Sequence, residues 1–96
     1  MIREHAILPV TAGREDEFLA AFGTVRSLIE SMPGCRGLTL SRSLETPTAF
    51  LLLVDWDSVE DHTEGFRGSA EYDRWRQVLH PFYDPFPDVQ HFVDVA

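Results

Sequence analysis

The stretch GLTLSRSLETPTAFLLLVDW, residues 37–56, decides the fold. In residues 37–44 apolar and polar side chains alternate, which is typical of a strand with one buried face. Residues 45–48, Glu-Thr-Pro-Thr, predict a hairpin turn, and residues 50–56 predict a strand that is apolar on both faces. The stretch therefore predicts an antiparallel hairpin whose second strand needs cover on both sides.

The sequence before this hairpin predicts one strand and one helix. Residues 2–10 alternate loosely between apolar and polar, as in a strand. Apolar side chains then recur at helical spacing, and acidic residues precede them, which predicts a helix over about residues 14–31. Pro33 and Gly34 form a turn signal that ends this helix.

The sequence after the hairpin predicts an interrupted helix and a last strand. Ser58 is a good N-cap for the helix, Gly65 and Gly68 weaken it, and Ser69 can cap a restart that runs to Pro81. Residues 89–95 alternate again. The order β-α-β-β-α-β predicts an α+β fold of the ferredoxin-like, split βαβ type, with a four-stranded antiparallel sheet and both helices on one face.

The second face of this sheet requires a partner. Residues 50–54, Phe-Leu-Leu-Leu-Val, have no polar break, so the face away from the helices is apolar as well. The commonest solution is a second copy of the chain, packed through a two-fold axis. We therefore predict a homodimer.

Composition narrows the classes of function. With 96 residues, 44% hydrophobic and 25% charged, we expect one globular domain over residues 1–96. Sixteen acidic against eight basic residues give a net charge of −8, which disfavours nucleic acid and anionic membrane surfaces as partners. All eight basic residues are arginine, so lysine chemistry is excluded. A single cysteine, Cys35, and no signal-like segment favour a cytoplasmic location.

These residues resemble the antibiotic biosynthesis monooxygenase family, whose small members form a dimeric α+β barrel. The resemblance covers nearly the whole chain and rests on the order and spacing of GREDEF (13–18), PGCRGLTL (33–40), VDW (54–56), SVEDHTEGFRGSAEYDRWR (58–76) and VQHFVDV (89–95). It implies a pocket between sheet and helices in each subunit.

The family's activities include cofactor-independent oxygenation of aromatic polyketides and quinols, haem degradation and isomerisation of small metabolites. Positions that the haem-degrading branch fills with asparagine, tryptophan and histidine fall here near His5, near Gly65 or Phe66, and near Arg76, so the resemblance implies no haem and no other cofactor. The resulting hypothesis is a cofactor-independent monooxygenase of a small phenolic or quinol substrate. A noncatalytic homodimer of the same fold, which binds a small apolar ligand or serves as an interaction module, stays open.

Two residues are candidates for catalysis. Cofactor-free oxygenation needs a base that removes a phenolic or enolic proton, and a donor for the oxyanion that forms. His62 shares a helical face with Val59 and Phe66, which points it towards the sheet and makes it the predicted base. Tyr72 is the predicted hydrogen-bond donor to the oxyanion. The alternative for His62 is a core histidine satisfied by one hydrogen bond.

Other aromatic residues are candidates for substrate binding or for the core. The predicted substrate-binding residues are Trp56, Phe66, Trp75, His5 and His91. Their alternative is structural packing, since aromatic residues at helical spacing usually lie in a core. We expect Arg67, Arg74 and Arg76 on a solvated face, and His80 beside the carbonyls of a helix end. No histidine pair has the spacing of a preformed metal site, so no metal is expected.

Overall fold

The computed structural model describes residues 1–96 and confirms the predicted α+β order of elements. Four strands and two main helices alternate as predicted, with two short helical turns beside the second helix. The elements are β1 (Ile2–Pro9), α1 (Glu15–Glu30), β2 (Cys35–Arg42), β3 (Ala49–Trp56), the π-helical turn η1 (Asp61–Phe66), α2 (Ala70–Leu79), the 3-10 turn η2 (His80–Phe82) and β4 (Val89–Phe92).

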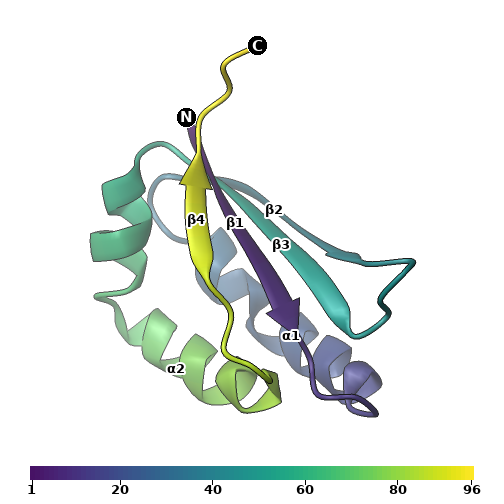
Figure 1. Cartoon of the computed structure of the whole chain (residues 1–96). Helices are drawn as coiled ribbons and strands as arrows, with labels where there is room; N and C mark the ends of the chain where they lie inside the picture. Colours follow the sequence, from purple (N-terminus) through teal and green to yellow (C-terminus); the bar gives the residue numbers. More distant parts are fainter.

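The sheet has the strand order β2-β3-β1-β4, and all neighbouring strands are antiparallel. Figure 1 shows α1 and α2 on the same side of this sheet, with the two chain ends close together beyond the top of β1 and β4. The central strand β1 pairs with β3 on one side and β4 on the other. In this register Glu4 lies opposite Val54 of β3 and opposite His91 of β4.

The core lies between the sheet and the helices. Phe18, Phe22, Val25 and Ile29 lie on one face of α1 and are buried, as their helical spacing predicts. In β3 every second residue is fully buried, ending at Trp56. Burial of each of these large side chains contributes roughly 2 kcal/mol, which holds the helices on the sheet. Neither helix is both long and apolar enough to cross a membrane.

The second helical segment is interrupted where the glycines predicted a weakness. The hydroxyl of Ser58 accepts a hydrogen bond from the Asp61 amide (3.2 Å) at the start of the segment. The chain then turns at Arg67 and Gly68, and the Ser69 hydroxyl accepts from the Tyr72 amide (3.1 Å) to cap α2. Both predicted caps are therefore confirmed.

Two predicted strand boundaries were wrong. The last strand ends at Phe92 rather than at residue 95, because Phe92 pairs with Arg3 and β1 begins one residue earlier, at Ile2. The strand predicted over residues 37–44 spans Cys35–Arg42 instead. The Ser43 hydroxyl accepts a hydrogen bond from the Thr46 amide and so already belongs to the hairpin turn.

The sheet face away from the helices is open in a single chain. Ile7 and Phe92 are 46% and 48% exposed there, and the β3 residues Leu51 and Leu53 are half-buried. Ile7 pairs with Leu51, so these apolar side chains are neighbours across two strands. Strand β3 is therefore apolar on both faces of the sheet, as the sequence predicts. That a second copy of the chain covers the open face stays a prediction.

Candidate functional site

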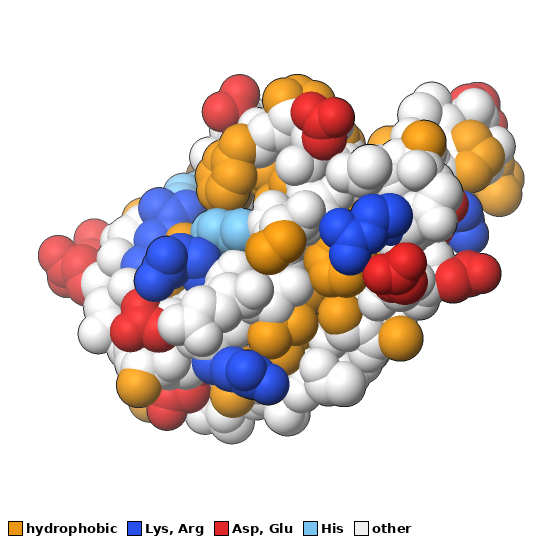
Figure 2. Space-filling model, turned by 90° about the horizontal axis from the view of Figure 1, so that it is seen from below, with side chains coloured by type: hydrophobic (Ala, Val, Ile, Leu, Met, Phe, Trp, Pro, Cys, Tyr) orange, Lys and Arg blue, Asp and Glu red, His pale blue; other side chains and the backbone are white.

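A cavity of about 430 Å³ lies between the sheet, η1, α2 and the segment that leads into β4. Its lining is mostly hydrophobic and aromatic, and its polar lining residues include Glu4, His62 and Arg67. Arg67 and Phe86 are exposed residues of the lining, so the cavity reaches the surface. Figure 2, which views the molecule from below, shows histidine atoms at the surface between arginine and hydrophobic atoms.

The polar floor of this cavity is formed by Glu4 and His62, which belong to a chain of four contacting side chains. The Trp56 indole Nε1 donates to Glu4 Oε1 at 3.0 Å, and His62 Nε2 lies 3.3 Å from the same oxygen. His62 Nδ1 in turn lies 2.8 Å from His91 Nε2. Glu4 and His62 are only 4% and 3% exposed. Buried polar groups of this kind require partners, and each of them has one here.

Three elements bring the chain together. Glu4 points from β1 towards the helices, and antiparallel pairing places His91 of β4 directly beside it. The π-helical turn η1 presents His62, whose ring stacks on Trp56 with centroids 5.5 Å apart and an angle of 21°. Phe66, four residues further on, closes the same side. The stack on Trp56 and the hydrogen bond with His91 hold the His62 ring in one orientation.

Burial controls the charges at this floor. Burial, together with the nearby Arg67 and His91, lowers the pKa of His62 to about 3, so the ring is neutral near pH 7. Burial raises the pKa of the Glu4 carboxyl, while the Trp56 hydrogen bond and Arg67 act against this rise. Burial and Arg67 also lower the pKa of His91. The contact between His62 Nε2 and Glu4 Oε1 is therefore a close approach of a neutral ring to the carboxyl group rather than an ion pair.

Aromatic side chains form the opposite wall. The rings of Tyr72 and His80 meet edge to face at 6.2 Å, and His80 meets Phe86 in the same way at 4.8 Å. Tyr83 packs against both His80 and Phe86. Burial, with the nearby Tyr72 and Glu4, raises the pKa of the Tyr83 phenol, which therefore stays protonated. This wall offers ring edges and hydroxyl groups to a flat molecule.

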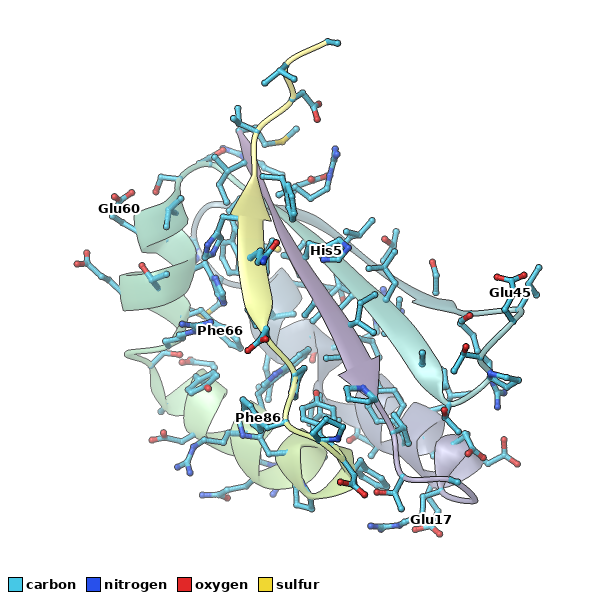
Figure 3. The ribbon with its side chains drawn as sticks, viewed as in Figure 1. His5, Glu17, Glu45, Glu60, Phe66 and Phe86 are labelled. Atoms are coloured by element: carbon cyan, nitrogen blue, oxygen red, sulfur yellow. The ribbon has the colours of Figure 1, made fainter.

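The structure separates the predicted site residues into three groups. His62, Tyr72, Phe66 and Trp75 line the cavity. Trp56 and His91 lie outside the lining and contact it through Glu4 and His62. His5 lies on the other face of the sheet, edge to face with Phe92 at 5.3 Å, and Figure 3 shows it at the front, with Phe66 on the η1 side and Phe86 below β4.

One sequence-based placement was incomplete and one was wrong. Arg67 is exposed as expected, but it also lines the cavity because the chain turns between η1 and α2. Arg76 does lie at the surface, where it pairs with Asp73 at 3.7 Å. His80 was expected beside helix-end carbonyls, but its ring packs among Tyr72, Tyr83 and Phe86 because η2 continues the helical turn beyond α2.

Sequence reasoning also missed Glu4. The even-numbered residues of β1 face the core, and Glu4 is the one acidic residue among Ile2, Ala6, Leu8 and Val10. An acidic residue on the apolar face of a strand was a readable signal, since such a group is rarely buried without a function or a partner. No group of three or more His, Cys, Asp and Glu side chains is arranged to hold a metal ion.

Comparisons with known proteins agree with this geometry. The family model described as Antibiotic biosynthesis monooxygenase matches residues 1–78. The uncharacterized protein YczJ of Bacillus subtilis (strain 168) is 50% identical over 95 residues, which cover 99% of this chain and all of YczJ. The chain is therefore similar over its full length to a protein whose own activity is not given by its name.

Solved structures show the same fold. A Bordetella bronchiseptica protein assigned to the antibiotic biosynthesis monooxygenases superposes with a TM-score of 0.93 at 37% identity, covering 99% of this chain and 97% of that one. SnoaB, a cofactor-independent oxygenase from Streptomyces nogalater whose structure is that of a mutant, gives a TM-score of 0.85 over 99% of this chain and 93% of its own. Its identity is 14%, so this likeness concerns the fold alone.

Proposed function

Because this chain belongs to the antibiotic biosynthesis monooxygenase family, we propose that it oxygenates a small phenolic or quinol substrate without a cofactor, inside the cavity of about 430 Å³. A cavity of this volume is within the range that encloses small organic ligands. Its aromatic wall of Tyr72, His80, Tyr83 and Phe86 suits a flat ring, since aromatic rings favour edge-to-face contacts.

The observation that carries the proposal is the buried Glu4–His62 pair in an otherwise mostly apolar cavity. A substrate that reacts with dioxygen unaided must first become an electron-rich anion, so the protein must take a proton from it. Buried acid and base groups in a pocket are the usual means. With an anthrone as substrate, one oxygen atom of dioxygen becomes the new carbonyl oxygen, and the other leaves as water with the two hydrogens of the substrate CH₂ group.

Two further side chains support the anion. Tyr72 lines the cavity, and its hydroxyl is the proposed donor to the substrate oxyanion. Arg67 lines the same cavity and pairs with no carboxylate, so its guanidinium is available for a negative charge. Both groups favour the ionised over the neutral substrate.

Oxygen uptake by the purified protein tests this function. A panel of hydroquinones and anthrones is mixed with the protein in the presence of a metal chelator, and dioxygen is followed with an electrode. We expect uptake above the rate of spontaneous oxidation for at least one member, and the same uptake by Arg74→Ala, which changes an exposed arginine outside the cavity lining. Ligand binding without uptake for the whole panel would instead establish the noncatalytic binding module.

We also propose that the open sheet face is a homodimer interface, as the apolar residues Ile7, Leu51, Leu53 and Phe92 on it suggest. Cover by a second copy removes this surface from water. Sedimentation at micromolar concentration should give a dimer for the wild type and a monomer for Leu53→Glu, which places a charge in the middle of the face. A monomeric wild type refutes the proposal.

A further inference from the structure

Two ring nitrogens approach the same one of the two Glu4 oxygens. Trp56 Nε1 and His62 Nε2 both lie against Oε1, at 3.0 and 3.3 Å. No group donates to Oε2. Every fully enclosed side-chain nitrogen or oxygen of this protein has a hydrogen-bond partner, and Glu4 lines the cavity. The unpartnered Oε2 is therefore the oxygen that a molecule in the cavity can reach.

The direction of the His62–His91 hydrogen bond depends on which nitrogen of the neutral His62 ring carries the proton. A neutral imidazole donates from one nitrogen and accepts at the other. If Nε2 carries the proton and donates to the Glu4 carboxylate, Nδ1 must accept, and His91 Nε2 is the group at 2.8 Å that donates to it. The chain then runs from His91 through His62 to Glu4, and Trp56 joins it from β3.

We propose that Glu4 is the general base of this cavity, and that His62, Trp56 and His91 are positioning residues that hold Oε1 and leave Oε2 for the hydroxyl of the substrate. This inference rests on the proposed function and moves the proton acceptor from the predicted His62 to its neighbour. His62 Nδ1 is hydrogen-bonded to His91 and His62 Nε2 lies against Glu4 Oε1 at 3.3 Å, whereas Glu4 Oε2 has no hydrogen-bond partner. Geometry, rather than residue type, selects the carboxylate.

The acid strength of the two groups supports the same assignment. A base works best when its pKa lies near the working pH. A ring with a pKa of about 3 holds a proton poorly at pH 7, whereas burial raises the pKa of the Glu4 carboxyl towards that range. The charged and titratable groups that face Glu4 from the surrounding elements are His62, Arg67, Tyr83, His91 and Cys35.

The proton step balances without any further reactant. The O–H bond of the phenol or enol breaks, its electron pair stays on the substrate oxygen, and the proton forms a bond with Glu4 Oε2. The negative charge moves from the buried carboxylate to the substrate, where the unpaired Arg67 at the cavity stabilises it. The net charge of the site is unchanged, so the low-dielectric interior opposes the transfer little.

Steady-state kinetics of three variants test the assignment. Glu4→Gln keeps the shape and an acceptor for Trp56 but lacks a basic oxygen, and we expect kcat to fall by about 10²-fold to 10⁴-fold. His62→Gln can still donate to Glu4, and we expect a loss of about tenfold or less. The control Glu64→Gln removes an exposed carboxylate from the same turn and should keep wild-type activity. A large loss in His62→Gln with a small one in Glu4→Gln overturns the proposal.

A measurement that needs no substrate separates this inference from the proposed function. Nitrogen-15 NMR of the histidine rings at pH 7 should show His62 protonated on Nε2 and accepting at Nδ1, with His91 protonated on Nε2. A His62 ring protonated on Nδ1 overturns the inference, because Nε2 would then accept a proton from an uncharged Glu4, which cannot act as base. If no compound in the panel reacts, the proposed oxygenase function is refuted. The tautomer of His62 still decides whether His62 is oriented towards the Glu4 carboxylate as proposed.

Discussion

Replacement of His62 by glutamine should remove a defined part of the pH dependence of folding stability. The buried ring has a pKa of about 3, whereas a histidine in an unfolded chain titrates near 6.5. Between these values the unfolded chain binds a proton at residue 62 and the folded chain does not. Stability from this lowered pKa is therefore fully present above pH 6.5 and is lost as pH falls towards 3.

The size of the effect follows from the two pKa values. Between pH 7 and pH 5 the unfolded ring gains its proton almost completely, and the folded ring stays neutral, which costs ~2 kcal/mol of unfolding free energy. His80 and His91, whose pKa values are also lowered, act in the same direction. Glu4 acts in the opposite direction, because its raised pKa adds stability as pH falls. The difference between wild type and variant isolates the share of His62.

Urea unfolding at pH 7 and pH 5 measures this share. Both proteins are followed by tryptophan fluorescence at one protein concentration, because self-association would make stability depend on concentration. We expect the loss between the two pH values to be ~2 kcal/mol smaller in His62→Gln than in the wild type. His5→Gln, on the other sheet face, is the control for removal of a histidine. An equal loss in His62→Gln and wild type would refute the reasoning about the buried ring.

Three further predictions concern stability, each measured by urea unfolding at pH 7. Gly34→Ala should cost at least ~1 kcal/mol, because Gly34 has a φ of 86° and an added Cβ would meet the Asp61 carboxyl group; Gly23→Ala, with open space in α1, should instead gain ~0.5–1 kcal/mol. Ser69→Ala should cost ~1 kcal/mol by removing the cap of α2, and Ser69→Asp should restore most of it. Trp56→Phe should cost ~1–3 kcal/mol, because it leaves a void and removes a donor from a buried carboxylate. Wild-type stability of Gly34→Ala, of Ser69→Ala or of Trp56→Phe would contradict the reasoning for that residue.

The order of the elements could be predicted because it depends on local patterns. Alternation over residues 37–44 and the apolar run at residues 50–54 predicted the hairpin, and the caps at Ser58 and Ser69 predicted an interrupted second helix. Each of these signals lies within a few residues of the structure that it specifies. The ends of the strands were less predictable, because β4 stops where its partner β1 begins rather than where its own alternation stops.

The sequence by itself therefore determined the βαββαβ order, the apolar faces and the candidate aromatic residues. Only the tertiary structure decided which polar groups meet. Three elements, β1, η1 and β4, supply Glu4, His62 and His91. These residues meet because the register of the sheet places His91 opposite Glu4, and η1 places the His62 ring in contact with both. Hydrogen bonds act over about 3 Å, and no spacing along the chain encodes a distance between elements that far apart in sequence.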